Sequence, residues 1–379
     1  MPPSPVTAEK SNVLVNAVIE ALRKRIDREP DSETIVNTLN NITNDFYQEG
    51  NYPQMEQVAR AALDLAERKL GSEHPDTLVS LNNLAALHEA RGRYGEAEPL
   101  HERVLVASER ILGTEHSNTL ASLNNLAMLY QTQGRYGEAE PLLQRVLAAS
   151  EQVLGAAHPR TLISLNNLAG LYQTQGRYSE AEPLYQRALA ESKRVLGAEH
   201  PDTLTALNNL AFLYQALGRY GEAEPLYQRA LATFEQVLGT EHPDTLTSLN
   251  NLAALYEAQG RHSEAEPLLQ RALSARERVL GLEHPDTLTS LNNLAALYRD
   301  QGRYKEAESF YQRATDSRQH VLGAEHPETL RTQLNLVVTH INNQQIPLAL
   351  QELREIDARL QGFVGSQLDN TLHERVRRQ

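Results

Sequence analysis

The sequence predicts an all-α chain in which pairs of helices stack into an open α-solenoid. The first observation is a motif of 42 residues that recurs along most of the 379-residue chain, with His-Pro or a close variant in every copy. The second is that apolar residues in each copy recur at helical spacing in two runs, with a glycine between them. Two helices of this length cannot bury their apolar faces alone, so neighbouring copies are expected to stack. The motif histidines are His74, His116, His158, His200, His242, His284 and His326.

One copy, residues 244–285, shows the predicted helix pair. The first helix, helix A, is expected to end at Gly260, which tolerates positive φ, and the second, helix B, at Gly281. Pro267 lies in or just after the first turn of helix B, where a missing N–H costs little. The apolar positions are Leu246, Leu249, Leu252, Ala253, Leu255 and Tyr256 in helix A, and Ala265, Leu268, Leu269, Ala272, Leu273, Val279 and Leu280 in helix B.

The two ends of the chain are predicted to close the array. Residues 1–10 are expected to be flexible, and residues 11–30 to form a capping helix with one apolar stripe. About eight units occupy residues 34–361; the first and last diverge, and Gln344 replaces the turn glycine of the last. Residues 366–379 are expected to form a C-terminal capping helix, which predicts a monomer, whereas an exposed apolar end would stack on another copy. The N-terminal stripe is Leu14, Val18, Leu22 and Ile26.

Composition excludes several classes of partner. The formal net charge is -13, from 36 Lys+Arg against 49 Asp+Glu, and a negative chain repels nucleic acid and anionic membrane surfaces. The chain has no Cys, and no window approaches 18 consecutive apolar residues. The N-terminus lacks the basic and apolar regions of a signal peptide. We therefore expect a cytoplasmic protein.

Candidate chemistry in the repeat has a structural explanation. Equivalent histidines of adjacent units are expected to lie roughly 10 to 20 Å apart, whereas a zinc ion needs its ligands within ~2.1 Å. His-Pro-Asp therefore opens helix A, and the Glu-Ala-Glu at the start of helix B complements the helix dipole. Signatures of nucleotide hydrolysis, serine hydrolysis and zinc proteolysis are absent from the sequence. We expect no enzyme activity, no cofactor and no metal site.

A family resemblance rests on these motifs. The pattern NLAxLYxxQGRYxEAEPLYxRAL, at residues 167–189 and with one change at residues 209–231, resembles the tetratricopeptide repeat (TPR). The 42-residue form, with LGxxHPDTLxxLNNLA, is similar to the kinesin light chain subclass. The resemblance implies a right-handed superhelix in which helix A lines a concave groove. No long heptad segment precedes the first repeat here, so no motor-adaptor role is expected.

An Asn-Asn pair recurs in helix A. In the family's pattern the first asparagine projects into the groove and the second packs between units, and consecutive helix residues do point about 100° apart. A carboxamide donates and accepts, so a row of them suits an extended main chain. The alternative is that the asparagines only solvate the groove or bond within helix A. The first asparagines, predicted to bind peptide, are Asn82, Asn124, Asn166, Asn208, Asn250 and Asn292.

Two variable positions follow each first asparagine. Four residues on, Met128 and Phe212 flank Gly170, which predicts an apolar notch; packing within the core is the alternative reading of Phe212. The full set is Ala86, Met128, Gly170, Phe212, Ala254 and Ala296. Three residues further come Glu89, Gln131, Gln173, Gln215, Glu257 and Arg299. In kinesin light chains basic groove residues help to recruit acidic cargo peptides, but only Arg299 is basic here, so an acidic ligand is not expected.

These features together predict a non-catalytic scaffold that binds an extended segment of a partner protein in the groove. Generic hydrogen bonds and one selected apolar side chain predict micromolar affinity. Two alternatives stay open: a regulatory or sensor arm that acts with a separate effector, and a self-assembling structural scaffold.

Overall fold

The computed structural model describes residues 5–359, and every regular element in this part of the chain is a helix. The prediction of an all-α chain is therefore confirmed. The predicted C-terminal capping helix over residues 366–379 lies outside the described residues. The helices are α1 (Pro5–Ile26), α2 (Ser32–Gln48), α3 (Tyr52–Lys69), α4 (Pro75–Ala90), α5 (Tyr94–Leu112), α6 (Ser117–Thr132), α7 (Tyr136–Leu154), α8 (Pro159–Thr174), α9 (Tyr178–Val195), α10 (Pro201–Ala216), α11 (Tyr220–Leu238), α12 (Pro243–Ala258), α13 (His262–Val279), α14 (Pro285–Asp300), α15 (Tyr304–Leu322) and α16 (Pro327–Asn342), followed by a helix over residues 346–359.

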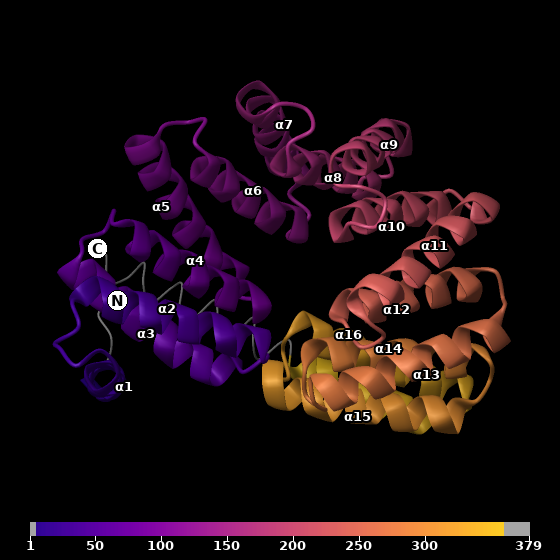
Figure 1. The fold of residues 1–379 in the computed structure, drawn as a ribbon. Helices are drawn as coiled ribbons and strands as arrows, with labels where there is room; N and C mark the ends of the chain where they lie inside the picture. The colour runs from indigo at the N-terminus through magenta and orange to yellow at the C-terminus, as the bar shows by residue number, and fades with distance from the viewer. Residues whose placement is uncertain (1–4, 360–379) are drawn as a thin grey trace, which may run out of the picture. The chain divides into compact units, whose positions relative to one another are not determined.

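The chain forms two units, an N-terminal unit of residues 1–237 and a C-terminal unit of residues 238–379. Helices adjacent in sequence pack on each other, as α2 does with α3 and α14 with α15. Even-numbered helices from α2 to α16 are the A helices of the repeats, and odd-numbered helices from α3 to α15 are the B helices. Within the N-terminal unit, α4, α6, α8 and α10 follow one another along the inner side of a curved row, and α5, α7 and α9 lie outside them (Figure 1). None of the helices within residues 5–359 is long and apolar enough to cross a membrane.

The first helix, α1, covers the first repeat. Val18 and Leu22 are buried against residues of α2 and α3, in agreement with the predicted apolar stripe. The helix begins at Pro5, so residues 5–10, which were expected to belong to a flexible stretch, are helical.

From α4 to α16, each A helix has its motif histidine as the N-cap, whereas α2 has Asp31. In α4, His74 has an extended backbone (φ -62°, ψ 139°) and Pro75 takes the first helical position. The His74 Nδ1 atom accepts the backbone N–H of Asp76 at 3.3 Å, and the other motif histidines do the same in their helices. This confirms that His-Pro opens helix A and shows that the imidazole is itself the N-cap, in the role that Ser or Asp usually has.

Glycine ends most helices, as predicted. Gly260 after α12 has φ 71° and Gly281 after α13 has φ 89°. Gln344, which replaces the turn glycine in the last repeat, keeps the same left-handed conformation with φ 62°, a conformation that is uncommon for a residue with a Cβ. The turn geometry therefore follows from the stacking of the helices even where the favourable residue is missing.

The core consists of leucine, alanine and tyrosine, as the periodicity indicates. Leu249, Leu255 and Ala265 are fully buried. Val279, which the sequence assigned to the same apolar series, is instead 48% exposed and lies at the last position of α13. Helix α13 begins at His262, which places Pro267 just after the first turn, as predicted.

Candidate peptide-binding surface

An arginine precedes each B helix from α5 to α15 and connects adjacent repeats, as Arg177 shows. Arg177 stacks on the ring of Tyr172, with its guanidinium carbon 4.1 Å from the ring centre. It donates to Glu180 of its own repeat and to Glu140 of the preceding one, both at 2.7 Å. These hydrogen bonds hold the pKa of Glu180 below its usual range. The two carboxylates of Glu-Ala-Glu therefore have separate partners, which the sequence analysis missed when it assigned both to the helix dipole.

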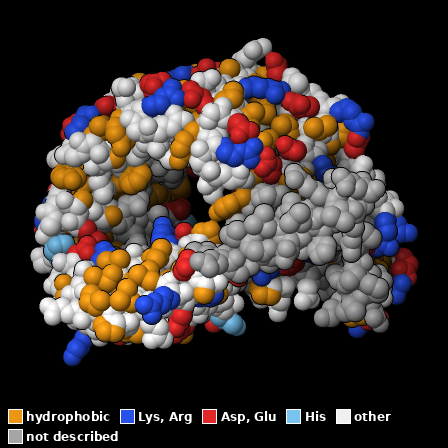
Figure 2. Space-filling view, turned by 180° about the vertical axis from the view of Figure 1, so that it is seen from behind, with side chains coloured by type: hydrophobic (Ala, Val, Ile, Leu, Met, Phe, Trp, Pro, Cys, Tyr) orange, Lys and Arg blue, Asp and Glu red, His pale blue; other side chains and the backbone are white. Residues whose placement is uncertain are grey.

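The same arrangement recurs along the chain. Guanidinium groups lie 4.0 to 4.2 Å from the ring centres in five repeats. Side chains of both charges are interspersed over the visible surface (Figure 2), as such ion pairs require. Each of these arginines thus stacks on the A helix that precedes it, and Arg135, Arg177, Arg219 and Arg303 also pair with a glutamate of the preceding B helix. The pairs are Arg135 with Tyr130, Arg177 with Tyr172, Arg219 with Tyr214, Arg261 with Tyr256 and Arg303 with Tyr298.

The asparagines of the A helices bond to one another between repeats. The Asn124 Oδ1 atom accepts from Asn167 of the next repeat at 2.6 Å, and Asn166 Oδ1 accepts from Asn209 at 3.1 Å. Asn166 Nδ2 also donates to the Leu162 carbonyl at 2.8 Å. The second asparagine thus packs between repeats, as predicted. Asn124 and Asn166 do not project freely, because the second asparagine of the next A helix donates a hydrogen bond to each of their oxygens.

The remaining first asparagines are also half-buried or buried. Asn292 Oδ1 accepts from Asn335 at 3.3 Å, and Asn250 Nδ2 donates to the Leu246 carbonyl at 3.0 Å. The buried Oδ1 atoms that have no partner among the described residues belong to Asn82, Asn208 and Asn250. Three members of the row, Asn124, Asn166 and Asn292, therefore bond to the next A helix, and the contact of the row with a peptide stays a prediction.

Large apolar side chains remain exposed on the A helices of the N-terminal unit. Phe212 is 55% exposed and Met128 39%, so neither is core packing. Two more were missed by the sequence analysis: Ile163 is 51% exposed and Val79 44%. They lie seven residues before Gly170 and Ala86, on the same face of the helix, and this spacing was the signal that could have identified them.

Gly170 leaves open space beside α8, and the notch that it was predicted to form with Met128 and Phe212 stays a prediction. A Cβ at this position would lie 3.5 Å from the hydroxyl of Tyr185 in α9, and no other atom lies within 4 Å. The Tyr185 side chain is buried, which raises its pKa to about 12 and keeps the hydroxyl protonated. Among the described residues, this hydroxyl has no hydrogen-bond partner, whereas Tyr227 one repeat later donates to Gln215 at 3.2 Å. The predicted notch would therefore have an unpaired hydrogen-bond donor at its floor.

The second variable row is polar and half-buried. Gln131 donates to Thr174 of the next repeat at 3.2 Å, and Gln215 accepts from Tyr227. In the C-terminal unit, Arg299 donates to its neighbour Asp300 at 3.0 Å. These contacts leave Gln173 as the member of the predicted glutamine set whose side chain has no hydrogen bond to another described residue.

The family model for the tetratricopeptide repeat matches seven overlapping segments that together extend from residue 34 to residue 356: 34–107, 81–152, 118–190, 160–233, 202–278, 250–320 and 286–356. The chain belongs to the tetratricopeptide repeat family. No curated protein matches the TPR chain.

Similar solved structures include proteins of the kinesin light chain type. A structure described as "Podosopora anserina putative kinesin light chain nearly identical TPR-like repeats" is 34% identical over 54% of this chain and 98% of its own, with a TM-score of 0.45. BtubC (BKLC) of P. vanneervenii is 26% identical over 63% of this chain and 93% of its own, with a TM-score of 0.46.

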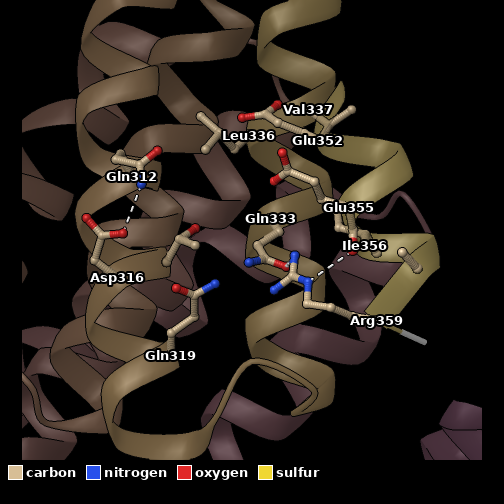
Figure 3. Close-up of a pocket in the computed structure, with 12 residues that line it drawn as sticks. Gln312, Asp316, Gln319, Gln333, Leu336, Val337, Glu352, Glu355, Ile356 and Arg359 are labelled. Carbon is tan, nitrogen blue, oxygen red and sulfur yellow. Dashed lines mark hydrogen bonds between the residues drawn. The ribbon is translucent and has the colours of Figure 1, made fainter. Parts of the chain in front are cut away.

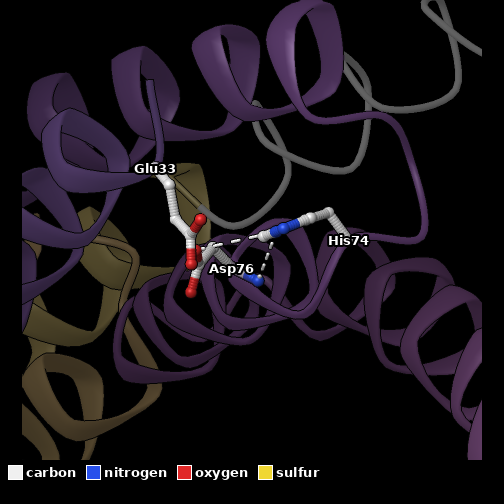
Figure 4. Close-up of side chains that lie close together, drawn as sticks. All are labelled: Glu33, His74 and Asp76. Atoms are coloured by element: carbon white, nitrogen blue, oxygen red, sulfur yellow. Dashed lines mark hydrogen bonds and ion pairs between the residues drawn. The ribbon is translucent and has the colours of Figure 1, made fainter. Parts of the chain in front are cut away.

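A cluster of possible metal ligands at the start of α4 is explained by the helix cap. Glu33, His74 and Asp76 bring three possible ligand atoms within 4.8 Å of one another (Figure 4). His74 is the N-cap of α4 in this group, and Asn37 donates to Asp76 at 3.3 Å. Because the cap recurs in every repeat, we assign no metal to it.

A cavity of about 560 Å³ lies in the C-terminal unit between α15, α16 and the helix over residues 346–359 (Figure 3). Its polar groups bond in part to each other: Gln312 donates to Asp316 at 2.9 Å and Arg359 to Gln333 at 3.2 Å. We assign no ligand to this cavity.

Proposed function

We propose that this TPR protein is a non-catalytic scaffold whose N-terminal unit binds an extended segment of another protein along the inner face of α4, α6, α8 and α10. The observation that carries the proposal is the exposure of Val79, Met128, Ile163 and Phe212 on that face. Exposed apolar side chains that gather on one surface mark interaction sites. Burying one of them against a partner is worth about 1.5 to 3 kcal/mol.

The surroundings of these side chains support a main-chain ligand. The asparagine row runs between the apolar residues, since Asn166 lies three residues after Ile163 and four before Gly170. Gln173 and the Tyr185 hydroxyl supply polar groups that no described residue engages. We propose that Asn82, Asn124, Asn166 and Asn208 form the polar floor, with Gln131, Gln173 and Gln215 at one edge.

In α12 and α14 of the C-terminal unit the corresponding positions are small or polar, although α16 at the end of the array again exposes Leu334, Val338 and Ile341. Thr247 and Thr289 occupy the positions of Val79 and Ile163, and Ala254 and Ala296 those of Met128 and Phe212. Arg299 and its neighbours place charges there instead. We therefore assign the main apolar contacts to the N-terminal unit, and to Asn250, Asn292 and Arg299 a secondary polar contact.

Binding to an array of peptides tests the proposal. The Phe212→Ala variant should lose at least about tenfold in affinity for wild-type ligands, which corresponds to one buried aromatic side chain. The matched control is Val195→Ala on the outer helix α9, where Val195 is 46% exposed. Equal affinity of wild type and of Phe212→Ala for the peptides would rule out the inner face of the N-terminal unit as the binding site.

A further inference from the structure

The large apolar residues of the N-terminal unit alternate between two rows. The second row is the position four residues after each first asparagine, and the first row is the position seven residues earlier on the same helix. In α4 and α8 the large residue is in the first row, as with Ile163 opposite Gly170, and in α6 and α10 it is in the second, as with Phe212 opposite Thr205. The first row is Val79, Ala121, Ile163 and Thr205; the second row is Ala86, Met128, Gly170 and Phe212.

The spacing of this zigzag follows from helix geometry. Seven residues along one helix separate the two rows by ~10.5 Å. Successive A helices pack directly, as the Asn167–Asn124 and Asn209–Asn166 bonds show, and directly packed helices lie about 8 to 10 Å apart. A ligand that follows the face therefore meets a large apolar residue about every 10 Å, first on one side and then on the other.

An extended peptide matches this alternation in one register. It rises about 3.3 Å per residue, and successive side chains point to opposite sides. Three residues therefore cover about 10 Å, and because three is odd, every third side chain changes sides. An α-helical ligand needs about seven residues for the same distance, which returns its side chain to the same side. Periods of two and four residues also keep one side and miss the spacing.

The face is also almost free of charge. Helix α6 contains no charged residue, and α8 and α10 contain one each, Arg160 and Asp202, at the second helical position. Helix α4 adds Asp76 at its own second position and Glu89, whose carboxylate lies 2.7 Å from His101. The chain as a whole is 22% charged. A charged ligand side chain brought between the rows would lose water without gaining a partner. The Tyr185 hydroxyl beneath Gly170 instead favours an uncharged hydrogen-bond acceptor in the middle of the ligand.

We infer that the partner segment is extended and uncharged, and that it carries large apolar side chains at every third residue, i, i+3, i+6 and i+9. The side chains i and i+6 contact the first row at Val79 and Ile163, and i+3 and i+9 contact the second at Met128 and Phe212, or the same order holds with the segment reversed. This inference rests on the proposed function and adds the register and the chemistry of the ligand.

Three peptides of thirteen residues and identical composition test the register. Each has four leucines in a background of serine and glutamine, at every second, third or fourth residue, and binding to the full chain is followed by fluorescence anisotropy. The period-three peptide should bind at least about tenfold more tightly than the other two. Comparable binding of all three would overturn the register and leave the proposed function standing. Binding of none would overturn both.

A swap within the protein gives an independent readout. Ala121→Met with Met128→Ala, combined with Thr205→Phe and Phe212→Thr, moves every large residue into the first row without changing composition. All four positions are exposed, so the variant should melt as wild type does. The period-three preference should then disappear, whereas the single change Val195→Ala on α9 should preserve it. A swapped protein that folds and still prefers period three overturns the inference.

Discussion

Arg177 lies flat against the ring of Tyr172, with its guanidinium carbon 4.1 Å from the ring centre, while its nitrogens hold carboxylates of two successive repeats. One side chain thus joins the A helix of its repeat to the B helices of its own and the preceding repeat. Stacking on an aromatic face and a planar fork of donors are properties of Arg that Lys does not share.

Arg177→Ala should lower the urea midpoint of unfolding, because it removes the stacking contact and both carboxylate bonds. Arg177→Lys should restore only part of the loss. The matched control is Arg194→Ala, which removes an exposed pair with Glu191 inside one helix and should change the midpoint little. Equal losses for Arg177→Ala and Arg194→Ala would contradict a connecting role for Arg177.

Asn166→Ala should destabilise the chain by about 1 to 2 kcal/mol, because two hydrogen bonds of its carboxamide are lost in a half-buried setting. Chemical denaturation measures the loss. Gln173→Ala is the control, since the Gln173 side chain makes no bond to a described residue and its loss should hardly affect stability. If peptide affinity falls in Asn166→Ala while stability does not, the asparagine row acts on the ligand rather than on the stack.

Gly170→Ala should separate stability from binding. Gly170 is helical, its new Cβ would meet Tyr185 only at an ordinary contact distance of 3.5 Å, and a helical Gly→Ala change is worth roughly 0.5 to 1 kcal/mol in stability. The same methyl would cover the Tyr185 hydroxyl, so ligand affinity should fall. Gly137→Ala on the outer helix α7, where a Cβ has nothing within 4 Å, should leave affinity unchanged. A more stable Gly170→Ala protein with full affinity would show that the notch is not used.

His88 should make the N-terminal unit sensitive to acid. Burial lowers its pKa to about 4, although Glu96 partly opposes this. The unfolded chain, with a His pKa of about 6.5, binds more protons than the folded chain between these values, so stability is lost as pH falls from about 6.5 to 4. The His88→Tyr variant carries the residue that the next repeat has at this position, Tyr130. Between pH 7 and pH 4.5 its free energy of unfolding should fall by roughly 1 to 3 kcal/mol less than that of wild type. Equal losses of stability in the variant and in wild type would contradict the assignment of this pH dependence to His88.

Glu257 should have the opposite pH dependence. Burial and the nearby Asp300 raise its pKa to about 7, so the folded chain binds more protons than the unfolded chain and stability falls as pH rises from about 4.5 to 7. Glu257→Gln should therefore be more stable than wild type at pH 8, with a smaller difference at pH 5. Glu264→Gln is the control of opposite sign, because hydrogen bonds from Arg261 lower the pKa of Glu264 and its charge is stabilising. Thermal melts at the two pH values compare the variants.

Much of the architecture follows from the repeat itself. The 42-residue period, the two apolar runs and the glycines predict the A and B helices, and the positions of Gly260, Gly281 and the motif histidines agree with the structure. These features are local: a helix cap or a left-handed glycine depends on residues a few positions away.

The site was predictable only in part. The sequence identified Met128, Gly170 and Phe212 as variable positions on helix A, and their exposure agrees with the notch. Tyr185 was missed because it lies on a different helix, in a position where other repeats use tyrosine for packing. The asparagine oxygens were assigned to a ligand because their actual partners are 43 residues away in the chain.

Periodicity along the chain alone therefore determined the helix pairs of the repeats and the turns between them, and that neighbouring repeats must share a core, but not the start of α1 at Pro5. Only the packing of one repeat on the next decided which polar groups are hydrogen-bonded within the protein and which apolar side chains remain exposed to solvent. The reason is that hydrogen bonds and burial depend on distances between residues of different repeats. Identical motifs therefore have different neighbours wherever a single residue such as Gly170 leaves space.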